Sequence, residues 1–103
     1  MGVERTVSFP AGSALPWPAV VGHLGGPVRL LMIDGLPALP DEEPPEGWQE
    51  LRLGTPAGMV TLRRTPAGAS VVIWGNADAA LQAAADVVAR AVADVTGGRV
   101  ETA

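Results

Sequence analysis

The sequence predicts a single α+β domain over residues 1–103, in which a mostly antiparallel sheet carries one long C-terminal helix on one face. Two observations lead to this fold class. The tetrapeptide Thr-Pro-Ala-Gly occurs at 55–58 and again at 65–68, between segments in which apolar and polar residues alternate, a pattern typical of β-hairpins. The segment 77–96 has apolar residues at helical spacing. We expect the order β-α-β-β-β-α.

The N-terminal third is predicted to contain two strands and a short helix. Residues 3–9 alternate and indicate the first strand. A helix is expected over 18–24, because the prolines at its start cost no helical hydrogen bond and glycines follow it. The segment 28–34 (VRLLMID) is apolar on both faces, which is typical of a central strand. A right-handed crossover through the short helix would place the first strand parallel to the second.

The middle of the chain is predicted to be a long loop followed by a three-stranded meander. Residues 35–47 hold four prolines and four acids, a composition that favours an extended connection. Strands are expected over 48–54, 59–65 and 70–75. Each Thr-Pro-Ala-Gly is predicted to form a type I turn, with its glycine in the left-handed position of a bulge. We interpret the repeat as one turn used twice, because a phosphate-binding loop would lead into a helix.

The C-terminal helix is predicted from Ala77 to Thr96. Asn76 is the expected N-cap, Asp78 lies in the first turn, where the helix dipole favours an anion, and Gly97 ends the helix. Its apolar side chains form one stripe that we expect to pack on the sheet, and its charged side chains occupy the opposite stripe. The apolar stripe consists of Leu81, Ala84, Val88, Val92 and Val95.

The composition excludes several classes of function. Eleven acids against seven arginines, with no lysine, give a net charge of −4, which argues against nucleic-acid binding because that depends on clustered cations. The absence of cysteine excludes disulfides and zinc-thiolate sites. Without a signal-like start or a long apolar run, we expect a cytoplasmic protein that does not bind membranes. The high Ala, Gly, Pro and Arg content indicates a GC-rich, bacterial genome.

Few residues are suited to catalysis, and we expect a non-enzymatic domain without cofactor or metal. His23 is the only histidine, and the chain has no lysine, cysteine or tyrosine for covalent chemistry. The acids of 35–47 are interpreted as a solvated loop, because the prolines hold their carboxylates apart. One alternative stays open. It is a small-molecule-binding protein or minor enzyme with a pocket between the Pro-rich loop and the sheet, near His23, Asp34 and Trp48.

The strands offer more apolar surface than the two predicted helices can cover. Both 28–34 and 70–75 are apolar on both faces, and each large side chain left in water forgoes about 1.5–3 kcal/mol. Exposed apolar area on this scale marks an interface. We therefore predict a homodimer, or docking on a protein partner, through an apolar sheet face. The competing arrangement folds the Pro-rich segment over that face. The predicted interface residues are Leu31, Ile33, Val72 and Trp74.

Overall fold

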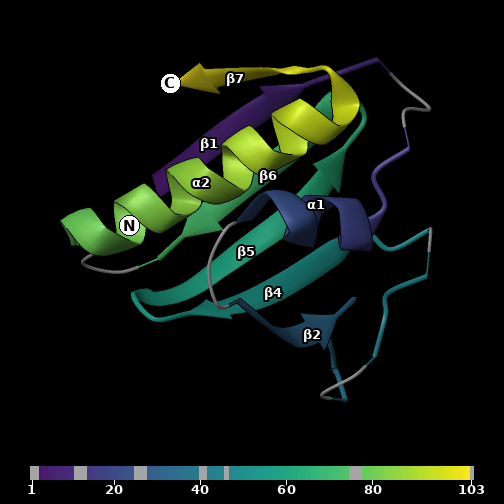
Figure 1. The fold of residues 1–103 in the computed structure, drawn as a ribbon, viewed down its shortest axis with the longest axis vertical. Helices are drawn as coiled ribbons and strands as arrows, with labels where there is room; N and C mark the ends of the chain where they lie inside the picture. Colours follow the sequence, from purple (N-terminus) through teal and green to yellow (C-terminus); the bar gives the residue numbers. More distant parts are fainter. Residues whose placement is uncertain are drawn as a thin grey trace.

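A computed structural model of the chain describes residues 3–10, 14–24, 28–39, 42–45, 47–74 and 78–102. Within these residues it has two helices and seven strands (Figure 1). Their order is β1 (Val3–Ser8), α1 (Trp17–Leu24), β2 (Arg29–Ile33), β3 (Leu36–Pro37), β4 (Glu50–Thr55), β5 (Gly58–Thr65), β6 (Gly68–Ile73), α2 (Ala79–Thr96) and β7 (Arg99–Thr102). The predicted α+β class, the meander and the long C-terminal helix are confirmed. The observed order is β-α-β-β-β-β-β-α-β, which has more strands than the expected β-α-β-β-β-α; strands β3 and β7 were not predicted.

The seven strands form one antiparallel sheet in the order β3-β2-β4-β5-β6-β1-β7. The first strand does not lie beside the second, since β4, β5 and β6 stand between them. The predicted parallel pairing of these strands is therefore wrong. The backbone of β1 instead bonds to β6 on one side and to the C-terminal strand β7 on the other. Both partner strands come from the C-terminal part of the sequence, far from β1 along the chain.

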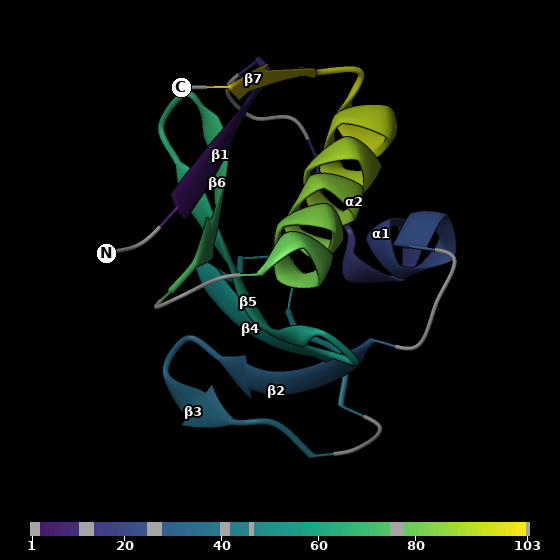
Figure 2. The ribbon, with the colours of Figure 1, turned by 90° about the vertical axis from the view of Figure 1, so that its left-hand side faces the viewer.

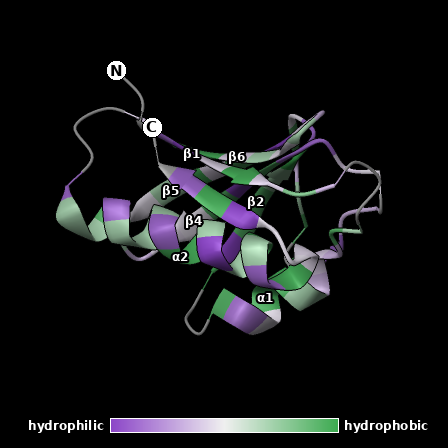
Figure 3. Cartoon of the chain, turned by 90° about the horizontal axis from the view of Figure 1, so that it is seen from above, coloured by the Kyte–Doolittle hydropathy of each residue, from purple (hydrophilic) through white to green (hydrophobic). Residues whose placement is uncertain are grey.

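Both helices lie on the same face of the sheet, and the sheet curves around α2 (Figures 1 and 2). Helix α2 packs on β1, β5 and β6, and α1 packs beside α2, as the view from above also shows (Figure 3). Arg5 of β1 forms an ion pair with Asp86 of α2 across this contact. The core lies between the helices and the central strands. The core side chains from β4, β5 and β6 are Leu51, Leu53, Val60, Leu62, Ala69, Val71 and Ile73.

Each Thr-Pro-Ala-Gly forms a two-residue turn between adjacent antiparallel strands, as predicted. The predicted bulge is absent, because Thr55 pairs with Gly58 and Thr65 with Gly68 without a shift in register. The glycine φ angles are accordingly +141° and +157°, more extended than the left-handed helical value of about +57°. In the first turn the Thr55 hydroxyl donates to the Gly58 carbonyl at 2.8 Å. The repeat is thus one turn used twice.

Helix α2 begins at Ala79 and is capped by Asp78, whose carboxylate accepts a hydrogen bond from the Leu81 N–H at 2.9 Å. The cap is therefore Asp78, which had been predicted to lie inside the first turn; the predicted cap, Asn76, lies outside the described residues. At the other end Gly97 has the expected left-handed conformation, with φ of 70°. In the part of the chain that the structure describes, neither helix combines the length and the apolar character needed to cross a bilayer.

Candidate interaction surface

The face of the sheet opposite the helices, which we call the open face, is the candidate site. Side chains alternate along the strands, so the residues between the core positions point to this face. The register arranges them in rows across the sheet. In one row Arg52 of β4 stands beside Thr61 of β5, Thr61 beside Val72 of β6, and Val72 beside Glu4 of β1. This row, which we call the central row, crosses four strands.

The open face also carries three exposed apolar side chains. Gly54 of β4 pairs with Met59 of β5. Trp74 directly follows β6, and the pairing of β5 with β6 ends at Thr61 and Val72, so Met59 and Trp74 are not cross-strand neighbours. Leu31 lies over Gly54, since a Cβ atom at Gly54 would stand 3.3 Å from its side chain. The exposed fractions are 38% for Leu31, 41% for Met59 and 57% for Trp74. We call these three residues the apolar row.

The middle of the open face is filled by small side chains that are already buried in the single chain. Thr61, Ser70 and Val72 are 3%, 7% and 5% exposed, although the helices lie on the other face. The register places the longer side chains of the neighbouring strands beside them, Arg52 next to Thr61 and Glu4 next to Val72. The sequence predicted that Val72 would be buried only by a partner protein. In the structure, side chains of the neighbouring strands already bury it within the single chain.

Charged side chains flank the apolar row on two sides of the open face. Glu50 of β4 forms ion pairs with Arg52 at 3.3 Å and with Arg63 at 3.4 Å. Toward β1 and β7, Glu4 and Glu101 are exposed and form no ion pair with any residue of the described ranges. The face is therefore net basic over β4 and β5, whereas toward β1 and β7 the two acids Glu4 and Glu101 stand near one base, Arg99, which pairs with Ser8.

Three of the four predicted interface residues, Leu31, Val72 and Trp74, lie on the open face. Ile33 lies on the helix-covered face, where it pairs with Leu51 and is 8% exposed. Met59 was not among the predicted interface residues. A signal for it existed, because Met59 precedes Thr61 by two positions in an alternating segment and must share its face.

The residues of the predicted pocket, His23, Asp34 and Trp48, are not brought together. The Nδ1 atom of His23 lies 2.9 Å from the carbonyl oxygen of Ala19, one turn earlier in α1, and its side chain is exposed. Trp48 is buried, with the guanidinium of Arg64 stacked 4.3 Å from its ring. Burial lowers the pKa of Arg64. The described residues contain no group of three His, Cys, Asp or Glu able to hold a metal ion.

Asp34 has a structural task in a tight turn. Asp34 and Gly35 both have positive φ, 50° and 84°, as a two-residue type I′ hairpin turn requires, and they join β2 to β3. The Asp34 carboxylate accepts hydrogen bonds from the backbone N–H groups of Glu50 at 2.9 Å and Gln49 at 2.7 Å. These bonds lower the pKa of Asp34, and the charge of Arg64 lowers it further. The carboxylate thus fastens the turn to the start of β4.

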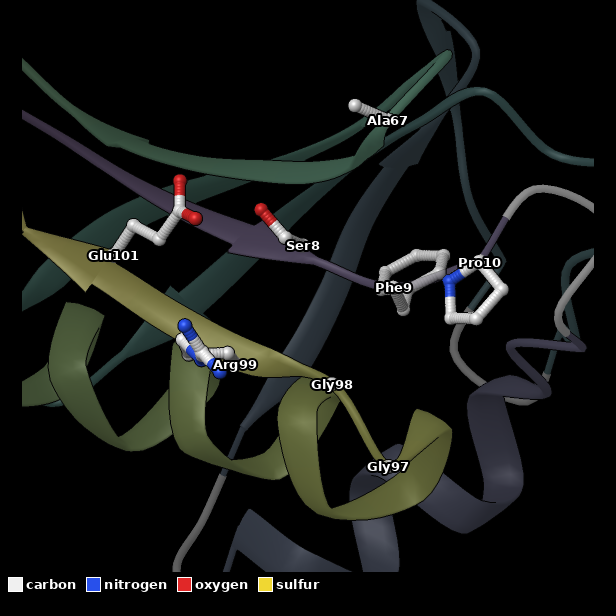
Figure 4. Close-up of a pocket in the computed structure, with 8 residues that line it drawn as sticks. All are labelled: Ser8, Phe9, Pro10, Ala67, Gly97, Gly98, Arg99 and Glu101. Atoms are coloured by element: carbon white, nitrogen blue, oxygen red, sulfur yellow. The ribbon is translucent and has the colours of Figure 1, made fainter.

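Two hollows at the margins of the sheet include residues of the open face, Ser8 and Glu101 in one and Leu31 in the other. One, of about 520 Å³, is an open groove at the end of β1 and β7 (Figure 4). Ser8 and Glu101 stand on neighbouring strands there, while Phe9 and Pro10 lie further along. The other, of about 320 Å³, lies between α1, β2 and the Pro-rich segment, and Trp17, Val21, Leu30 and Ala38 are among its lining residues. Neither is lined by His23, Asp34 or Trp48.

Comparison with known proteins finds no match to this chain among protein-family models, curated proteins or solved structures.

Proposed function

We propose that this chain is a small non-enzymatic interaction domain that self-associates through the open face of its sheet. The observation that carries the proposal is the apolar row, formed by Leu31, Met59 and Trp74 on a face that the described helices leave uncovered. Aromatic and methionine side chains with a polar rim are the composition typical of a protein interface. Here the rim is supplied by Glu50, Arg52 and Arg63.

The size of the open face favours a weak, concentration-dependent dimer. Four central strands spaced about 4.8 Å apart, with six residues rising about 3.3 Å each, span about 400 Å² per copy. A stable interface buries about 800 Å² per partner. Docking on a different protein through the same face is the other form that this function would take.

The test is the mass of the protein in solution as its concentration rises from about 10 μM to about 1 mM, a range that brackets weak association. Sedimentation equilibrium should show the 10.5 kDa chain shifting toward twice that mass. The double variant Met59→Ser/Trp74→Ser should stay monomeric, because it replaces two members of the apolar row. Val87→Ser is the matched control, since Val87 is similarly exposed, at 44%, on α2.

A wild-type chain that stays monomeric throughout this range would contradict self-association. Equal weakening by Val87→Ser and by the double variant would show that general surface hydrophobicity, rather than the open face, drives the association.

A second candidate function is small-molecule binding in the cavity between the Pro-rich segment and β2. Its volume of about 320 Å³ is at the lower end of the range of ligand pockets, about 300–1,000 Å³. Trp17, Val21 and Leu30 give it an apolar wall, and Arg29 and Glu42 are also among its lining residues. An apolar dye whose fluorescence rises with the wild type, but not with Leu30→Trp, would support this function. An equal rise with both would count against it.

A further inference from the structure

We propose that two copies of this chain pack open face to open face about a two-fold axis parallel to the strands, so that Arg52 of each copy meets Glu4 of the partner subunit. This arrangement rests on the proposed function and adds which surfaces meet and in what register. It makes a second copy of this chain, rather than another protein, the occupant of the open face.

The central row carries opposite charges at equal distances from its midpoint. This row reads Arg52, Thr61, Val72 and Glu4 across four adjacent strands, so its midpoint lies between Thr61 and Val72. With strands about 4.8 Å apart, Arg52 and Glu4 each stand about 7 Å from the midpoint, on opposite sides. The row thus has a base at one end, an acid at the other and two small side chains between them.

A two-fold axis along the strands, placed over this midpoint, reverses the order of strands in the facing copy. Arg52 then lies over Glu4 of the partner subunit, and Thr61 over Val72 of the partner subunit. The same operation turns the side of the open face that carries Met59 toward the side of the partner subunit that follows β6. One axis therefore brings opposite charges together at both symmetric contacts, as a self-complementary interface requires.

An axis in the same plane but perpendicular to the strands does not achieve this match. With that axis, each strand would lie over the same strand of the partner subunit, with the two ends of the strand exchanged. Through the same midpoint it would place Arg52 over Arg52 of the partner subunit and Glu4 over Glu4 of the partner subunit, and it would turn Met59 toward Arg63 and Ser70. The charge pattern therefore favours the axis parallel to the strands.

In the single chain, Glu4 and Arg52 can each still form an ion pair with a second copy. Glu4 is exposed and forms no ion pair with the residues that the structure describes. Arg52 is 42% exposed at its side chain, and its carboxylate partner Glu50 is shared with Arg63. A carboxylate from a second copy would give each arginine a partner of its own.

The edge strands contribute less to this interface than the central strands do, because the sheet curves away from the open face toward the helices (Figure 2).

The two-fold arrangement predicts a specific result from two charge reversals, Arg52→Glu and Glu4→Arg. Each variant alone opposes like charges at both symmetric contacts, so each should dimerise at least about tenfold more weakly than wild type, the change that 1.4 kcal/mol produces. An equimolar mixture of the two variants restores opposite charges at both contacts. The mixture should form heterodimers with an affinity within a few-fold of the wild-type homodimer.

Native mass spectrometry and sedimentation equilibrium distinguish the heterodimer from the two homodimers, and thermal unfolding checks that each variant is folded. If Arg52→Glu does not fold because its new acid adjoins Glu50, the neutral variants Arg52→Gln and Glu4→Gln measure the same pair. Their double variant should then dimerise no more weakly than either single one.

The outcomes separate this arrangement from the proposed function. Dimerisation that Met59→Ser/Trp74→Ser abolishes, without recovery in the charge-reversed mixture, would overturn the arrangement and leave the open face as the interface. If the wild-type chain is monomeric, the arrangement and the proposed function are both overturned. The same holds if neither set of substitutions changes the dimerisation affinity.

Discussion

The helix-covered face and the open face of the sheet are built by the same strands, yet they differ in what they can do. On the covered face Leu51, Leu53 and Leu62 are fully buried. On the open face the same strands present Arg52, Glu50 and Arg63, which stay partly exposed in ion pairs. Because side chains alternate along a strand, one sequence can place its stability on one face and its recognition surface on the other. Substitutions on the two faces should therefore affect stability and association separately.

The largest expected effect is the contrast between a core residue and a residue of the apolar row. Leu62→Ala should lower the free energy of unfolding by about 2–5 kcal/mol, because it leaves a cavity under α2. Trp74→Ala should change it by less than about 1 kcal/mol, as is usual for an exposed side chain. Chemical denaturation of the monomer at low concentration measures both. Similar losses from the two variants would show that the open face also carries the stability of the fold.

A smaller contrast is expected between the two glycines of the repeated turn. A Cβ atom at Gly68 would stand 1.9 Å from the carbonyl oxygen of Val7, so Gly68→Ala must displace β1. At Gly58 the nearest atom belongs to the flexible side chain of Leu81, at 3.3 Å. Both variants strain a positive φ, which costs about 1–3 kcal/mol, and Gly68→Ala should cost more.

Hydrogen exchange separates the two glycine variants by location. Gly68→Ala should reduce the protection of the β1 amides, because the added atom meets the β1 backbone. Gly58→Ala should leave that protection near its wild-type level. Equal exchange of β1 in both variants would show that the close approach of β1 to Gly68 does not limit its position.

The smallest expected effect concerns Asp34, at the end of the sheet, and it depends on pH. Since its folded pKa is lowered, Asp34 stabilises the fold above its unfolded value of about 3.9, and this contribution is lost as the pH falls through the folded pKa. Asp34→Asn should therefore reduce stability at neutral pH and make it fall less steeply below about pH 5. Glu50→Gln, which removes two partly exposed ion pairs, should cost about 0–1 kcal/mol. Unchanged acid sensitivity in Asp34→Asn would contradict the role of the turn carboxylate.

Local sequence patterns determined the elements whose conformation depends on near neighbours. The turns at Pro56-Ala57 and Pro66-Ala67 follow from proline and glycine in the same four letters, and the end of α2 at Gly97 follows from the need for a left-handed residue. The separation of Leu62 from Arg63, one to each face, follows from the alternation of side chains along a strand. These features need no knowledge of the rest of the chain.

The tertiary structure alone decided which strands meet and therefore what the open face contains. Strand β7 is four residues long, too short to show an alternating pattern, and it exists as a strand because β1 lies beside it. Leu31 reaches the open face because the register shifts between Leu30 and Met32 against β4. Val72 is buried there by side chains of β1 and β5. Strands distant in sequence pair through backbone hydrogen bonds, which nearly any residue can form. The side-chain pattern of one strand therefore does not predict which other strand will pair with it.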